Sequence, residues 1–190
     1  SDADAIFVNN IFLRIIPERP TTVKIVENRG RDIAPFLLSF PEIWSDFDFV
    51  LHLHSKRSPH TGFGAKWSDW IFRNILSDSN ITLAALRHIE ENPNLAMLFP
   101  DNYHDIKRFA GWGGNEDRSR ALLARFGFEN VEFPAYPHFA AGSMAWFRTK
   151  PFASFIGKIG IDDFETEDGQ VEGTLAHVLE RLLPFYITLA

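Results

Sequence analysis

The densest group of chemically useful side chains is the stretch His52-Leu53-His54-Ser55-Lys56-Arg57-Ser58, which carries two imidazoles, an ammonium, a guanidinium and two hydroxyls. Together these donors suit a diphosphate or another polyanion. The two histidines also allow a shared metal ion completed by Asp101, His104 or Asp105, although their spacing is a weak signal. In a third interpretation the imidazoles only hydrogen-bond to neighbouring carbonyl groups. The spacing leaves all three open.

A second group is acidic and lies within residues 165–172, directly ahead of a long amphipathic segment. A helix dipole keeps a carboxylate at its N-terminus ionised, which suits a base that accepts a proton from a hydroxyl group. Glu172 is the candidate for that base, and an acidic loop with a helix cap is the alternative. Farther along, we expect His177, Glu180 and Arg181 to form an ion-pair set on one side of the helix.

Both groups depend on the elements that hold them. Residues 47–54 alternate between apolar and polar types, which predicts a strand with His52 and His54 on a shared side at its carboxyl end. Ligands of open α/β sheets bind at that end of the strands. Further strands are expected at 5–8, 22–26, 95–99, 139–147 and 185–189. Helices are expected from Pro35, at 67–76, 81–91 and 116–126, and at 172–183 before Pro184. This alternation predicts one layered α/β domain over residues 1–190, with a mostly parallel central sheet flanked by helices.

Composition narrows the class of protein. The 190 residues include 19 Lys+Arg and 25 Asp+Glu, a net charge of −6, which argues against a general nucleic-acid binder. The absence of cysteine excludes disulfides and thiolate metal sites and is compatible with a reducing cytosol. The apolar runs are too short to span a bilayer, while a peripheral membrane role stays open. Aromatic residues make up 14%, enough to fill a core or to line a cleft.

Two glycine-containing segments lack the patterns of common catalytic motifs. Gly142-Ser143-Met144-Ala145 has no second glycine at the position that a nucleophile elbow needs, which argues against a serine hydrolase. Gly111-Trp112-Gly113-Gly114 does not lie between a predicted strand and helix, and no phosphate-loop lysine motif occurs.

Four ordered segments together resemble the rhamnan synthesis protein F family of bacterial polysaccharide assembly. They are Gly30-Arg31-Asp32-Ile33-Ala34-Pro35-Phe36-Leu37, the 52–58 stretch with Trp67 downstream, Ala141-Gly142-Ser143-Met144-Ala145-Trp146, and residues 172–182. Each segment is short, but the ordered set is specific and covers the chain from about Ile6 to Leu183.

The resemblance implies a GT-A-type, Rossmann-like glycosyltransferase domain. Its expected activity is transfer of a deoxysugar, with rhamnose the first choice, from a nucleotide-diphosphate donor to a growing cell-surface polysaccharide such as rhamnan or a lipopolysaccharide O-antigen. The expected acceptor is a lipid-linked glycan, and the expected place is the cytoplasm, at the inner face of the inner membrane.

The same resemblance assigns roles to residues. On the donor side, the residues expected to bind the diphosphate are Arg31, Asp32, His52, His54 and Lys56. On the acceptor side, the expected residues are Trp67, Gly142, Ser143, Met144 and His177, and Glu172 is the expected base. Because the histidines and the lysine stand where many GT-A enzymes carry Asp-x-Asp, a cation rather than a bound metal is expected to neutralise the leaving diphosphate. A divalent metal cofactor lacks the support of that motif.

Two departures from the family pattern keep alternatives open. Little precedes Ile6, so the nucleotide-binding first strand is expected to be missing and the chain to be a fragment that binds nucleotide-sugar weakly. The absent Asp-x-Asp motif is the second departure. The rival functions are a non-catalytic glycan-binding or scaffolding module with the same fold, and a metal-dependent hydrolase built on the two histidines and the 101–105 loop.

Overall fold

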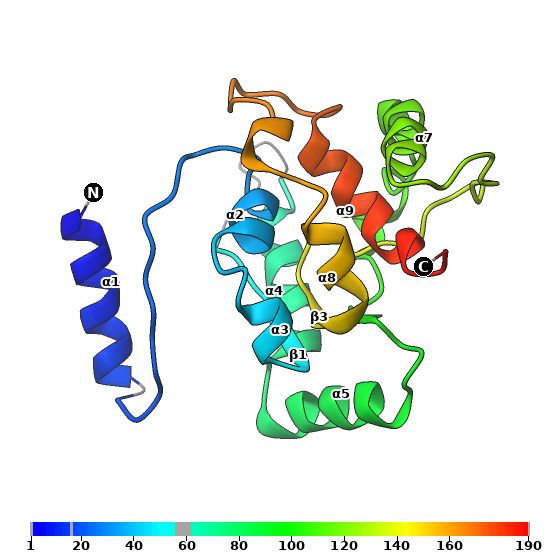
Figure 1. Cartoon of the computed structure of the whole chain (residues 1–190). Helices are drawn as coiled ribbons and strands as arrows, with labels where there is room; N and C mark the ends of the chain where they lie inside the picture. Colours follow the sequence, from blue (N-terminus) through cyan, green and yellow to red (C-terminus); the bar gives the residue numbers. More distant parts are fainter. Residues whose placement is uncertain (1, 16, 56–61, 190) are drawn as a thin grey trace.

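The computed structural model describes residues 2–15, 17–55 and 62–189. The longer helices are α1 (Asp2–Ile15), α4 (Gly64–Ile75), α5 (Ser79–Glu91), α7 (Glu116–Arg125) and α9 (Leu175–Tyr186). The shorter helices are α2 (Ile33–Leu38), α3 (Ile43–Asp46), α6 (His104–Lys107) and α8 (Lys150–Ile156), with two 3-10 turns at Gly113–Asn115 and Ile161–Asp163. The strands are β1 (Phe49–His52), β2 (Met97–Leu98) and β3 (Ala145–Arg148). The expected mixture of helices and strands is therefore confirmed (Figure 1).

The strands form a small sheet in the order β1-β3-β2, and β3 pairs antiparallel with both neighbours. Val50 and Met97 lie opposite Phe147, and His52 lies opposite Ala145. The prediction of a mostly parallel central sheet is therefore wrong for the described part of the chain. Two strands run parallel only when a crossover connection brings the chain back to the same end of the sheet. Here the chain enters β3 from the opposite end, and β3 lies between β1 and β2 and runs antiparallel to both.

Three of the predicted strands are not strands. Residues 5–8 belong to α1, whose first residues are acidic and whose last turn holds Arg14, as the helix dipole favours. Residues 22–26 run without a strand partner, and residues 185–189 form the end of α9 and a turn after it. Pro184 lies inside α9 instead of ending it. The short helix α8, with Pro151 in its first turn, lies outside the predicted elements.

The sheet separates two apolar clusters. In β3 the side chains alternate, so that Ala145 and Phe147 join the larger cluster and Trp146 joins the smaller one. The larger cluster includes the apolar stripe of α9, which confirms the predicted core positions Leu175, Val178, Leu179, Leu182. The smaller cluster packs α4 and α5 against the other face through residues Ile71, Ile75 and Ile89.

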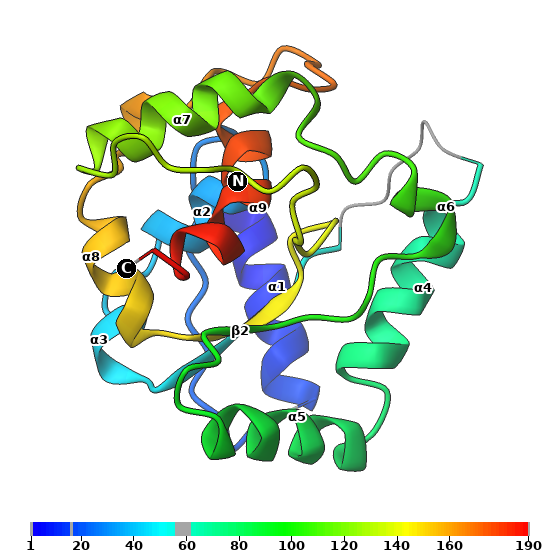
Figure 2. The ribbon, with the colours of Figure 1, turned by 90° about the vertical axis from the view of Figure 1, so that its right-hand side faces the viewer.

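The two ends of the molecule differ in their surroundings. Figure 2 shows α7 beside α9 at one end and α5 at the other. Figure 1 shows α1 apart from the other helices, joined to them by an extended segment. Apolar side chains of α1 stay largely exposed, among them Phe7 at 66% and Ile15 at 70%. No described helix combines the length and apolar character needed to cross a membrane.

Candidate functional site

A pocket of about 170 Å³ lies between α2, the end of β1, α4 and α9. It collects residues that are far apart in the chain and that belong to all four family-like segments. Its polar lining consists of Arg31, Asp32, His54, Ser68, Ser143, His177 and Glu180. Its remaining lining consists of Ile33, Gly64, Trp67, Ile71, Gly142, Met144 and Ala176. A cavity with apolar walls and a few converging polar groups is the usual form of a small-molecule site.

One wall of the pocket is the turn before β3. Gly142 and Ser143 both have left-handed backbones, with φ of 90° and 55°. A Cβ atom on Gly142 would lie 3.2 Å from both Ile71 Cδ1 and Trp67 Cζ2. Glycine therefore suits this position for two reasons, its backbone angle and the close approach of α4.

The two histidines after β1 hold this turn by its carbonyl groups. His52 Nδ1 donates to the Ser143 carbonyl at 2.8 Å, and His54 Nε2 donates to the Gly142 carbonyl at 2.7 Å. His52 is buried and stacks on Phe36 with ring centres 4.0 Å apart. Burial lowers the pKa of His52, so its ring is neutral at physiological pH. Both histidines therefore hydrogen-bond to carbonyl groups, which are the contacts expected in the third interpretation of this stretch.

Asp32 and Glu180 approach the same turn from opposite elements. The Ser143 hydroxyl donates to Asp32 Oδ2, which also lies 3.8 Å from His54 Nε2. Glu180 Oε1 accepts from the Gly142 N–H at 2.7 Å. The side chains that contact the turn therefore bring two carboxyl groups to one small cavity.

The carboxyl group of Glu180 has a strongly shifted pKa. Burial raises its pKa to about 7, and the nearby charges of Asp32 and Glu172 act in the same direction. Arg181 and the Gly142 N–H oppose the rise without cancelling it. The side chain is 20% exposed and lines the pocket. A carboxyl of this kind changes protonation near neutral pH.

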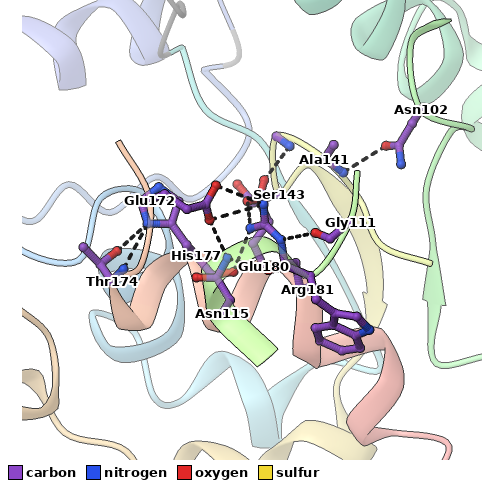
Figure 3. A network of polar contacts seen from close by, with 12 residues as sticks. Asn102, Gly111, Asn115, Ala141, Ser143, Glu172, Thr174, His177, Glu180 and Arg181 are labelled. Atoms are coloured by element: carbon purple, nitrogen blue, oxygen red, sulfur yellow. Dashed lines mark hydrogen bonds and ion pairs between the residues drawn. The ribbon is translucent and has the colours of Figure 1, made fainter. Parts of the chain in front are cut away.

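Glu172 occupies a different environment. Its carboxylate accepts from Asn115 Nδ2 and from Arg181 NH2, the latter at 3.3 Å (Figure 3). Arg181 is buried and donates further to the carbonyls of Gly111 and His177, at 2.8 and 3.1 Å. Glu172 is not among the residues that line the pocket.

His177 lines the pocket from α9, and its hydrogen bonds define the tautomer of its ring. The Thr174 N–H donates to His177 Nδ1 at 3.3 Å, so the proton of the neutral ring is on Nε2. Burial and the neighbouring Arg31 charge lower the pKa of His177. The ring is therefore a neutral donor at the pocket.

Arg31 is held by the acidic loop. Its backbone is left-handed, with φ of 57°, and its N–H donates to Glu167 Oε1 at 2.8 Å. Its guanidinium donates to the Gln170 carbonyl. Part of the acidic segment thus serves to place a cation at the pocket.

Most of the predicted site residues meet at this pocket. Those that line it are Arg31, Asp32, His54, Trp67, Gly142, Ser143, Met144 and His177. His52 contacts the turn without lining the pocket, and Glu172 is bound by Asn115 of the 3-10 turn before α7 and by Arg181 of α9. Lys56 lies outside the described residues. Glu180 also lines the pocket, but the sequence analysis assigned it only to an ion-pair set and not to the site. Its position three residues after His177, on the same face of the helix, was the signal that could have identified it.

The residues proposed for a metal site at the 101–105 loop have other partners. Asp101 forms an ion pair with Lys107 at 2.5 Å, and His104 lies 3.4 Å from Asp105. Within residues 2–15, 17–55 and 62–189, no three His, Asp or Glu side chains form a group that could hold a metal ion. The described geometry therefore adds no support to the hydrolase alternative.

Comparison with known proteins identifies relatives of this chain. Two proteins named "Uncharacterized protein WxcX", from Xanthomonas campestris pv. campestris strains B100 and ATCC 33913, are each 32% identical over 165 residues. The match covers 85% of this chain and 23% of each relative, so the chain spans about a quarter of their length. No solved structure matches the chain. The model of the family described as rhamnan synthesis protein F matches residues 9–190. The chain therefore belongs to the rhamnan synthesis protein F family.

Proposed function

We propose that this domain is a glycosyltransferase of polysaccharide synthesis, which moves a deoxysugar, with rhamnose the first choice, from a nucleotide-diphosphate donor to a growing glycan. The family name associates the chain with rhamnan synthesis. The observation that carries the proposal is the pocket, because it joins all four family-like segments around polar groups.

The dimensions of the pocket favour a single sugar unit. Its volume of about 170 Å³ is below the roughly 300–1,000 Å³ of sites that enclose drug-sized ligands. Trp67 provides an aromatic wall, with Ile71 and Met144 beside it. Aromatic and apolar walls suit the less polar face and the methyl group of a deoxysugar, while Asp32 and Ser68 suit its hydroxyls.

The charges favour a division between sugar and diphosphate. Among the described lining residues Arg31 has the fixed positive charge, and two carboxyl groups lie beside the 142–143 turn. We therefore place the neutral sugar in the pocket and the diphosphate toward Arg31. Lys56 keeps the diphosphate-neutralising role that the resemblance implies. The lipid-linked acceptor and the inner face of the inner membrane belong to the same proposal.

A transfer assay tests this function. The full-length native protein is supplied with rhamnose donors whose nucleoside diphosphate carries thymine, uracil or guanine, and with membranes that contain lipid-linked glycan. We expect release of the nucleoside diphosphate together with incorporation of labelled rhamnose into glycan. Binding of rhamnose without any transfer would instead favour the non-catalytic glycan-binding module.

A matched pair of tryptophan variants ties the assay to the pocket. Trp67→Ala removes the aromatic wall and is expected to raise KM for the donor by about tenfold or more. Trp70→Ala lies three residues later in α4, is 40% exposed and does not line the pocket, and should leave KM unchanged. Equal effects of the two substitutions would contradict the pocket assignment.

A further inference from the structure

We propose that Glu180 is the base of the transfer, the group that takes the proton from the attacking hydroxyl. This inference rests on the proposed function. In the step, the acceptor oxygen forms a bond to the anomeric carbon of the donor sugar. The bond from that carbon to the diphosphate oxygen breaks, and the nucleoside diphosphate leaves with the electron pair. The hydroxyl proton passes to the Glu180 carboxylate, so charge and atoms balance.

The first support is position. Glu180 is in the middle of α9, its side chain is 20% exposed, and it lines the pocket. The Gly142 N–H binds Oε1 at 2.7 Å and fixes the carboxyl group against the turn. Oε2 lies 3.6 Å from Arg181 NH1, beyond ordinary hydrogen-bond distance. One carboxyl oxygen is thus anchored, while the other retains capacity to accept a proton.

The second support is the contrast with Asp32 in the same cavity. Asp32 accepts from the Ser143 hydroxyl and lies 3.8 Å from His54 Nε2, so its Oδ2 atom has side-chain partners. Glu180 accepts instead from a backbone N–H, and desolvation raises its pKa to about 7. Two carboxyl groups with different partners can divide the work of binding and proton transfer. Asp32 then holds sugar hydroxyls, and Glu180 exchanges the proton.

The third support comes from the rival base. The Glu172 side chain is 45% exposed, and both of its oxygens are engaged by Asn115 and Arg181. It does not line the pocket that holds the other family-like residues. A base must reach the proton it removes, directly or through one water. By this geometric requirement Glu180 is the better placed of the two.

The neighbouring charges set the direction of the pH dependence. Asp32 on the α2 side and Glu172 before α9 favour the protonated form of Glu180, and Arg181 favours the ionised form. His177 is held neutral by its lowered pKa, while Arg31 and His54 complete the polar wall. Since a base works in its ionised form, transfer is expected to rise with pH through about 7 and then level off.

The experiment compares single-turnover transfer by the full-length native protein, measured from pH 5.5 to 9 with a nucleoside-diphosphate-rhamnose donor. Glu180→Gln is expected to lower the rate about 10²–10⁴-fold and to abolish the rise near pH 7. Glu180→Asp should restore part of the rate together with the pH rise. Glu172→Gln should keep the rise. Glu90→Gln, an exposed glutamate of α5, is the matched control and should leave both rate and profile unchanged.

A second measurement keeps the test independent of how the variants fold. Carbon-13 labelling of glutamate carboxyls in the wild-type chain follows the Glu180 titration directly, and the resonance missing from Glu180→Gln assigns it. A midpoint near 7 supports the inference, and a midpoint near 4.5 contradicts it. Wild-type transfer with an unchanged rate in Glu180→Gln would overturn the inference alone. A wild-type protein that transfers no sugar would overturn the proposed function and this inference with it.

Discussion

The acidic loop of residues 165–172 and the pocket wall at Glu180 use carboxyl groups in opposite ways. In the loop, Glu165 binds Arg118 at 2.5 Å and caps the Leu175 N–H of α9 at 2.9 Å. Glu167 fixes the backbone of Arg31. At the pocket wall, Glu180 is half-buried, accepts from one backbone N–H and faces a cavity. The carboxylates of the loop stabilise the scaffold, whereas the Glu180 carboxyl is placed for proton exchange.

Arg181 connects the two regions, since it contacts both Glu172 and Glu180. Arg181→Met should therefore have the largest effect, a loss of about 3–5 kcal/mol in the free energy of unfolding at pH 8, because it removes a buried cation that contacts two carboxyl groups and two backbone carbonyls. Urea denaturation measures it. Arg73→Met, an exposed α4 variant, is the control and should cost under about 0.5 kcal/mol. If Arg181→Met lowered the free energy of unfolding no more than the control does, Arg181 would not be the group that stabilises Glu172 and Glu180.

Glu180→Gln should have the next largest effect on the free energy of unfolding, and it should raise this free energy at pH 8. Glu180 titrates near 4.5 when unfolded and near 7 when folded, so the folded state binds more protons between these values. Its stability contribution is present below pH 4.5 and is lost as pH rises through 7. The variant should match the wild type near pH 4.5 and be about 1–3 kcal/mol more stable at pH 8. Parallel stability curves over this range would contradict the burial of an ionisable carboxyl.

Glu165→Gln should have the smallest effect, because glutamine still accepts from the Leu175 N–H and only the charge is lost. Burial alone would raise the pKa of Glu165, but the bonds from Leu175 and Arg118 lower it below its ordinary value. Its contribution is therefore present above about pH 4.5 and fades below. We expect a loss of about 0.5–1 kcal/mol at pH 7 that shrinks in high salt, measured by thermal unfolding. Asp168→Asn, exposed in the same loop, should change stability by less than about 0.5 kcal/mol.

Local patterns in the sequence predicted much of the secondary structure. The alternation before His52 identified β1, and the apolar stripe from Leu175 to Leu182 identified α9, because each pattern reflects one buried face. The run at residues 5–8 was misjudged because a short apolar stretch fits a helix as well as a strand. The antiparallel pairing of β1 with β3 depends on segments far apart in the chain, and periodicity carries no record of partners.

The residues of the candidate site could be predicted from the sequence about as well as the secondary structure. Arg31, His54 and Ser143 were found through short motifs, and the structure brings them to one pocket. Glu180 was overlooked because a charged residue next to Arg181 in a helix resembles a solvated ion pair. Its burial arises only when the 142–143 turn packs on α9, a contact that the local pattern does not encode.

The placement of β3 between β1 and β2 also governs when the protein can fold. β1 gains its partner only after the chain has grown by roughly 90 further residues, and Glu180 lies still later. At synthesis rates of about 5–20 residues per second, β1 waits on the order of 5–20 s with unpaired backbone groups. Such non-local pairing slows folding, because distant segments must meet before their contacts contribute. The pocket is therefore among the last features of this domain to form, because its wall is incomplete until the segment that contains Glu180 has been made.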